Sequence, residues 1–143
     1  MTLQSAYELV PKATRPGRNE VVFEETNRSA LSPLLPRIGG RVAFLADGRA
    51  VSYAESYLGL VEAYKLGALV GERTAGTNGN INAFRLPGGY RVTFTGLKEL
   101  KHDGSRHHGV GIAPTVPCAP TVAGIAAGRD EVLECGIAAL SSR

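Results

Sequence analysis

Hydrophobic and polar positions follow a regular order between residues 41 and 70. RVAFLA (41–46) is a mostly apolar run, which is typical of a strand covered on both faces. Segment 53–66 has helical spacing, with apolar residues at Ala54, Tyr57, Leu58, Val61 and Tyr64. Gly67 suits the position after the helix C-cap, and ALV (68–70) follows as a short strand. The pattern predicts a parallel strand–helix–strand unit within an α/β fold.

A second pattern, with a period of two, follows a polar loop over 71–82. In YRVTFT (90–95) apolar and polar residues alternate, and NAFRL (82–86) precedes it across the turn PGG. Two such runs around a glycine turn indicate a β-hairpin. LKEL (97–100) is expected to continue as another strand.

The two ends of the chain differ from this ordered middle. Near the C-terminus, Asp130 can cap a final helix over 131–141, with an apolar face of Leu133, Ile137 and Leu140. The N-terminal part contains four prolines, and only VVF (21–23) resembles a strand. We therefore expect an extended, proline-rich segment over 1–38 and an ordered α/β unit over 39–143.

Composition narrows the classes of partner. The 143 residues carry a net charge of +3 and no Trp, and no basic run alternates with aromatic residues, which argues against nucleic-acid binding. No apolar stretch reaches the roughly 20 residues of a membrane span, and MTLQSAYELVPK lacks the apolar region of a signal peptide. Cys118 and Cys135 are too far apart for a CxxC motif, so we expect free thiols, with one disulfide as the alternative.

Ser52 is the first candidate for chemistry, because it stands where the predicted strand gives way to the predicted helix. The unpaired N–H groups of a helix N-terminus can accept a capping hydroxyl or stabilise an oxyanion. Ser52 and Glu55 fit the capping box S-x-x-E, and the chain lacks a G-x-S-x-G motif. The local residues alone therefore favour a cap over a nucleophile.

Two polar loops supply the other candidates. HDGSRHHGVGIAP (102–114) contains His102, Asp103, His107 and His108, which allow a metal site, a single histidine acting as base or polar partner, or a solvated loop. Neighbouring histidines on a strand point to opposite faces, which disfavours the metal. GTNGN (76–80) lacks the lysine of a phosphate-binding P-loop and is better suited to shaping a peptide or acyl site. No cofactor or metal is expected.

Several motifs in order resemble the tail-specific, or C-terminal processing, serine proteases, including their tricorn-core branch. They are GRAVSYAE, GERTAGTNGNINAFRLPGGY, DGSRHHGVGIAPTV and GRDEVLE, within about residues 39–141. The resemblance implies a peptidase core related to the ClpP and crotonase fold. It also implies that Ser52 is the nucleophile, that the Tyr53 N–H forms half of an oxyanion hole, and that the substrate is a peptide or protein. Related proteases often act in the cell envelope.

The chain also departs from that family. The processing peptidases have a lysine base about 25 residues after the nucleophile, where this chain has Thr77. In the tricorn-like branch a glutamate precedes the G-[VI]-x-P turn, and its place falls on His108, which thus becomes a candidate polar partner or replacement base. The upstream strand and helix of the family's catalytic domain have no clear counterpart in 1–38.

These departures lead to two hypotheses from different functional classes. In the first, the chain is the C-terminal portion of a serine peptidase domain, inactive alone and competent with the missing half. In the second, it is a non-catalytic peptide-binding or assembly module. An acyl-CoA binder is a weaker third alternative, because no basic nucleotide pocket is evident. Apolar surface left uncovered by a missing half is expected to promote self-association.

Overall fold

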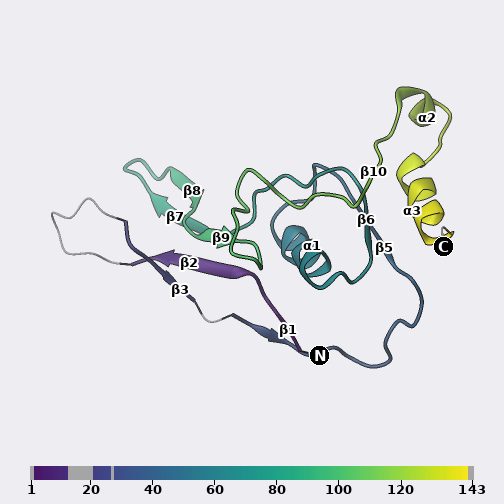
Figure 1. Ribbon diagram of the computed structural model, residues 1–143. Helices are drawn as coiled ribbons and strands as arrows, with labels where there is room; N and C mark the ends of the chain where they lie inside the picture. Colours follow the sequence, from purple (N-terminus) through teal and green to yellow (C-terminus); the bar gives the residue numbers. More distant parts are fainter. Residues whose placement is uncertain (1, 13–20, 27, 142–143) are drawn as a thin grey trace.

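A parallel sheet with one helix on each side forms the centre of the molecule. The computed structural model describes residues 2–12, 21–26 and 28–141 (Figure 1). Strands β5 (Ala43–Ala46), β6 (Ala68–Gly71) and β10 (Val116–Pro117) lie in the order β10-β6-β5, with both pairings parallel. Helix α1 (Tyr53–Tyr64) connects β5 to β6, so the predicted strand–helix–strand unit is confirmed. Helix α3 (Glu131–Ser141) lies on the other side of β5 and β6 (Figure 1).

The apolar core lies between α1 and this sheet. Leu58 and Val61 of α1 pack with Leu69 of β6 and with Ile112 from the loop before β10. Gly67 does not cap the helix, because the left-handed residue there is Lys65, with φ 51°. A Cβ at Gly67 would lie 2.3 Å from the carbonyl oxygen of Val42. Gly67 therefore permits close approach of the chain to the start of β5, and its predicted role as the residue after the C-cap is wrong.

The described residues of the N-terminal segment, 2–12, 21–26 and 28–38, contain short strands that pair into sheets. Strand β2 (Tyr7–Pro11) lies between β3 (Phe23–Glu25) and β9 (Lys98–Leu100), antiparallel to both. Short strands β1 (Leu3–Gln4) and β4 (Ala30–Leu31) pair with each other. The strand expected at 97–100 is confirmed as β9, whereas the sequence patterns did not identify β2.

This N-terminal segment contacts the end of α1. The backbone N–H of Gln4 donates to the Tyr64 hydroxyl at 2.9 Å, and the Gln4 carbonyl lies 2.9 Å from His102 Nε2. The segment therefore forms one wall beside α1, and the residues that follow β9 hold it in place.

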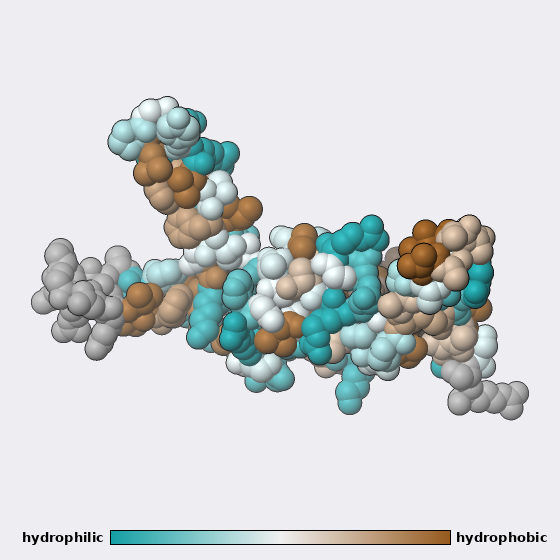
Figure 2. All heavy atoms as spheres, turned by 90° about the horizontal axis from the view of Figure 1, so that it is seen from above, coloured by the Kyte–Doolittle hydropathy of each residue, from teal (hydrophilic) through white to brown (hydrophobic). Residues whose placement is uncertain are grey.

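The predicted hairpin is confirmed and projects from the body of the protein. Strands β7 (Ile81–Arg85) and β8 (Arg91–Thr95) pair antiparallel, and they form the arm that points away from the centre in Figures 1 and 2. Phe84 and Phe94 make an edge contact across the pair, with ring centroids 6.0 Å apart. Both rings remain about half exposed, so this arm packs little against the sheet.

The C-terminal region differs from the expectations in two respects. Cys118 and Cys135 form a disulfide that joins the end of β10 to α3, so the prediction of free thiols is wrong. Asp130 Oδ1 accepts from the Leu133 N–H at 2.9 Å, which confirms the predicted cap of α3. However, Leu133 and Ile137 are 47% and 57% exposed, since α3 packs on β5 through the buried Gly136.

A short helix that the patterns did not predict, α2 (Val122–Ala126), precedes α3. None of the helices in the described part of the chain is both long and apolar enough to cross a bilayer.

Candidate active site

Ser52 adopts a backbone conformation that L-residues rarely adopt. Its φ and ψ are 54° and −123°, at the turn between β5 and α1. Its carbonyl accepts from the N–H groups of Glu55 and Ser56 at 2.8 and 3.2 Å, so the backbone of Ser52 starts the helix. Its hydroxyl makes no capping hydrogen bond. A positive φ at a serine costs on the order of 1–3 kcal/mol, and such strain is concentrated at functional sites.

Glu55 does not complete a capping box either. Its side chain is 1% exposed and accepts three hydrogen bonds from the loop after β6: Thr74 Oγ1 at 2.5 Å, Gly76 N at 2.6 Å and Thr77 N at 2.8 Å. Burial alone would raise the pKa of Glu55, but these hydrogen bonds outweigh it and lower the pKa below its usual value. Glu55 therefore anchors this loop to α1, and the capping-box interpretation of Ser52 and Glu55 is wrong.

A cavity of about 410 Å³ lies beside Ser52. Four segments form its wall: the start of α1, loop residues 78–80, the N-terminal strands and β9. The lining residues are Ser5, Ala6, Glu8, Ser29, Leu31, Ser52, Tyr53, Ser56, Tyr57, Leu60, Asn78, Gly79, Asn80 and Glu99. Residues 78–80 of the GTNGN loop therefore form part of the wall of the Ser52 cavity. The cavity is within the usual size range of ligand sites.

Tyr53 is the first residue of α1 and lies at the same cavity. Its backbone N–H makes no hydrogen bond to any described residue, as is typical of the first turn of a helix. The N-terminal end of α1 also carries the positive end of the helix dipole. An anion formed next to Ser52 would therefore meet a free N–H and a favourable field.

The three histidines take different positions. His107 is 3% exposed, and its Nε2 lies 3.4 Å from Glu55 Oε1 without a hydrogen-bond partner. His102 stacks edge-on against Tyr64, with ring centroids 5.7 Å apart. His108 is exposed, does not line the Ser52 cavity, and accepts from Arg106 Nε through its backbone carbonyl. The structure thus brings Ser52 and Tyr53 together at one cavity and leaves His108 outside its lining.

Glu99, a carboxyl group in the wall of this cavity, was not predicted from the sequence. Glu99 is 8% exposed, and the Asn78 amide donates both to Glu99 Oε1 and, at 2.7 Å, to Ser56 Oγ. Burial, then the charges of Glu8 and Glu55, raise the pKa of Glu99 to about 7, against the opposing effect of Asn78. No local signal marks Glu99, because its burial depends on the pairing of β9 with the unpredicted β2.

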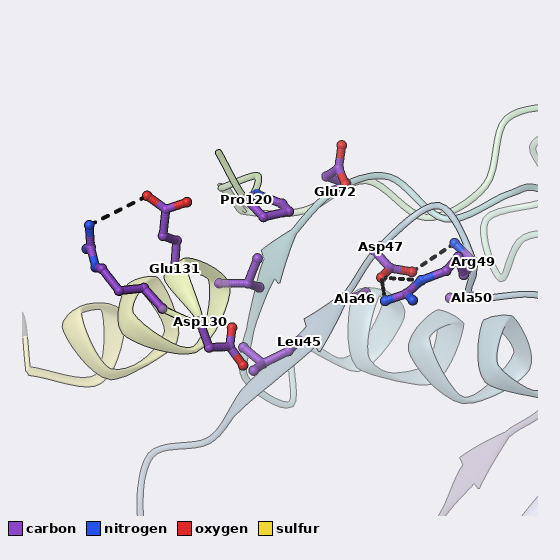
Figure 3. A pocket seen from close by; sticks show the side chains of 11 residues that line it. Leu45, Ala46, Asp47, Arg49, Ala50, Glu72, Pro120, Asp130 and Glu131 are labelled. Carbon is purple, nitrogen blue, oxygen red and sulfur yellow. Dashed lines mark hydrogen bonds and ion pairs between the residues drawn. The ribbon is translucent and has the colours of Figure 1, made fainter. Parts of the chain in front are cut away.

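A larger cavity, of about 710 Å³, lies on the other side of the sheet (Figure 3). Its charged residues are largely paired among themselves. Arg49 binds the Asp47 carboxylate through Nε at 2.9 Å and Nη2 at 2.6 Å, and Arg129 lies 3.8 Å from Glu131. This cavity does not include Ser52, so the smaller one is the better candidate active site.

Comparisons with solved structures show which proteins have a similar fold. A candidate peptidase from Parabacteroides merdae ATCC 43184 is 25% identical, with a TM-score of 0.82, and the match covers 99% of this chain and 44% of that one. The photosystem II D1 C-terminal processing protease is 21% identical, with a TM-score of 0.58 and coverage of 82% and 29%. Mature CPAF in complex with lactacystin is 20% identical, with a TM-score of 0.58 and coverage of 66% and 20%.

These solved structures are considerably longer than the matched region, and this chain spans less than half of the Parabacteroides merdae protein. No curated protein matches the sequence. The model of Peptidase family S41 matches residues 2–118, and so includes the N-terminal segment as well as the motifs after residue 39. With most of its length matched in this way, the chain belongs to Peptidase family S41.

Proposed function

We propose that this chain carries the nucleophile of a serine-type peptidase, and that Ser52 is that nucleophile. The observation that carries the proposal is the conformation of Ser52. Its φ of 54° is strained, its hydroxyl caps nothing, and it lies at a cavity beside a free helix N-terminus. A serine kept only as a cap would have an extended backbone and a hydroxyl bound to the helix. Membership of Peptidase family S41 supports the same conclusion.

In the proposed reaction, Ser52 Oγ attacks the carbonyl carbon of a peptide bond and loses its proton to a general base. The carbonyl oxygen becomes an oxyanion that accepts from the Tyr53 N–H. Collapse of this intermediate breaks the C–N bond, and the amine leaves with a proton from the same base. Water then hydrolyses the ester on Ser52, which releases the acid product and restores the hydroxyl.

We infer that neither of the two positions suggested by the sequence, Thr77 and His108, supplies the general base. Thr77, at the position of the family's lysine, has no basic group, and its N–H is bound to Glu55 at 2.8 Å. His108 is exposed and does not line the cavity. The Parabacteroides merdae structure contains a large region that this chain does not match, and we propose that an equivalent region supplies the base. Activity then requires this chain together with that region.

The parallel unit with a serine at the N-terminus of its helix also supports a fold of the ClpP and crotonase type. In that arrangement, residues 39–143 form the C-terminal portion of the catalytic domain, and 1–38 are the N-terminal segment that precedes it.

Labelling with a fluorophosphonate probe tests the nucleophile. The probe is applied to this chain and to the longest natural protein that contains it, each as wild type, Ser52→Ala and Ser56→Ala. Ser56 is the matched control, because it lines the same cavity one helical turn further along α1. We expect the longer protein to be labelled in the wild type and Ser56→Ala but not in Ser52→Ala. Labelling that survives Ser52→Ala, or that is absent from every wild-type protein, refutes the proposal.

A second candidate function is peptide binding without cleavage. The absence of a basic group at Thr77 favours it, since a nucleophile without its base loses most of its rate. The same cavity would then bind a peptide segment reversibly. Peptide binding measured by fluorescence anisotropy, combined with no probe labelling of any longer protein, would favour this alternative over the peptidase.

A further inference from the structure

Two carboxylates are the only charged side chains that line the Ser52 cavity in the described structure. Glu8 lies on β2 and Glu99 on β9, and the register of the two antiparallel strands places them directly opposite each other. Like charges in directly opposite positions of a sheet destabilise it. A repulsive pair inside a cavity therefore needs a physical reason, and a cation bound there would supply one.

The nearby basic residues do not neutralise this pair. Neither Glu8 nor Glu99 forms an ion pair with any residue that the structure describes. Lys101 binds Glu62 at 2.9 Å, and Lys98 lies over the Phe23 ring, 5.7 Å from its centroid. Arg28 lies over the ring of Tyr7 at 4.1 Å and donates to the Ser5 carbonyl at 2.8 Å. Each of these cations is engaged elsewhere.

Glu99 is also held in place for binding. It is more than nine-tenths buried, and the Asn78 amide fixes one of its carboxylate oxygens, Oε1. The second oxygen, Oε2, has no hydrogen-bond partner among the described residues, although Glu99 lines the cavity. This oxygen is accessible from the cavity, since His107 Nε2 is the one buried side-chain nitrogen or oxygen without a partner among the described residues. A cationic N–H donor entering the cavity would satisfy it and would separate the charges of Glu99 and Glu8.

The rest of the cavity suits a long side chain with a charged end. Leu31, Tyr57 and Leu60 supply apolar wall, against which the methylene groups of a lysine or arginine can pack. Ser52 lies in the same cavity, so a side chain bound by the two carboxylates would belong to a residue near the attacked bond. The occupant with this chemistry is a basic residue of an extended peptide.

We propose that Glu8 and Glu99 form an acidic subsite that selects peptides with a lysine or arginine side chain next to the bond presented to Ser52. The proposal rests on the proposed function, because it takes the Ser52 cavity to be where a peptide binds. It adds a substrate class that family membership alone does not supply.

Peptide binding to the Ser52→Ala protein tests the subsite without relying on catalysis. Two fluorescent peptides that differ only in lysine or norleucine at one position are titrated at pH 8, and the position is moved along the peptide in a series. We expect the lysine peptide to bind roughly tenfold more tightly at one position, as charge-assisted hydrogen bonds provide. The combined change Glu8→Gln and Glu99→Gln should remove most of that preference.

Glu25→Gln is the matched control. It removes the same charge from the neighbouring strand β3, at an exposed residue outside the cavity, and should leave the lysine preference unchanged. In the protein that keeps both carboxylates, a higher salt concentration should weaken binding of the lysine peptide more than binding of the norleucine peptide. This measurement needs no variant at Glu8 or Glu99.

The possible results separate this proposal from the proposed function. Equal affinities for lysine and norleucine peptides at every position, or a lysine preference that persists in the double variant, overturn the subsite. If the acidic subsite is overturned in this way but the probe still labels Ser52, the proposal that the chain carries a peptidase nucleophile stands without the subsite. A lysine preference that depends on both carboxylates, without labelling of Ser52 in any protein, supports the subsite in a peptide-binding module.

Discussion

Replacing Glu99 by glutamine should change how the stability of the chain depends on pH. Burial and the charges of Glu8 and Glu55 raise the pKa of Glu99 to about 7, from its usual value of 4.5. Between these two values the folded state holds a proton that the unfolded state has released. Stability contributed by protonated Glu99 is therefore present at low pH and is lost as the pH rises through this window. Glutamine does not ionise, so the variant should not lose this part of its stability as the pH rises.

The size of the effect follows from the same values. A tenfold change in an acid dissociation constant corresponds to about 1.4 kcal/mol. Raising the pKa of Glu99 from 4.5 to about 7 therefore costs the folded protein about 3 kcal/mol once the group is ionised. Near pH 4.5, Glu99→Gln should unfold with nearly the same free energy as the wild type, because glutamine keeps an oxygen for the Asn78 amide. At pH 8 the variant should be more stable by up to about 3 kcal/mol.

Urea unfolding followed by circular dichroism at pH 5, 6, 7 and 8 measures this difference. The groups facing Glu99 are Glu8 on β2, Glu55 on α1 and the Asn78 amide, and all remain in the variant. Glu25→Gln, an exposed change on β3, should leave the pH dependence as in the wild type. A free-energy difference between Glu99→Gln and wild type that stays constant from pH 5 to pH 8 would refute the reasoning.

Three further changes test other parts of the structure. Ser52→Gly should abolish probe labelling and raise stability by about 1 kcal/mol, because glycine accepts the positive φ; a loss of stability on urea unfolding would contradict this. Glu55→Gln should cost on the order of 3 kcal/mol, since the buried carboxylate accepts three hydrogen bonds, and because these bonds lower the pKa of Glu55, acidification below pH 4.5 should destabilise the wild type. The exposed Leu133 and Ile137 on α3 should promote self-association, so light scattering should show oligomers that become monomers when both are changed to glutamate.

Periodicity predicted the elements whose contacts are local in the sequence. The helix over 53–66 and the hairpin around PGG were found because their apolar positions repeat over a few residues. Strand β2 was missed because its identity depends on pairing with β9, about 90 residues away. The sequence does not reveal the disulfide for a similar reason. The distance between Cys118 and Cys135 is set by how α3 packs on the sheet.

The candidate site shows the same limit in its chemistry. Glu99 and Glu8 occupy unremarkable positions in their own strands, and only the antiparallel register makes them neighbours. Glu99 is further buried by α1 and by the loop that Glu55 holds. Its chemistry is therefore a property of the assembled wall, which no motif around residue 99 describes.

Ser52 and Glu55 show how one short pattern can have two physical meanings. In a capping box both side chains bind N–H groups of their own helix, so the contacts span only a few residues. Here the partners of Glu55 are Thr74, Gly76 and Thr77, 19 to 22 residues away, and the hydroxyl of Ser52 binds none of the helix N–H groups. Glu55 is occupied by the loop, and the Tyr53 N–H beside the serine makes no hydrogen bond to any described residue. The residues that resemble a cap thus leave the helix uncapped, and a free helix N-terminus next to a strained serine is the arrangement that the proposed acyl transfer would use to stabilise its oxyanion.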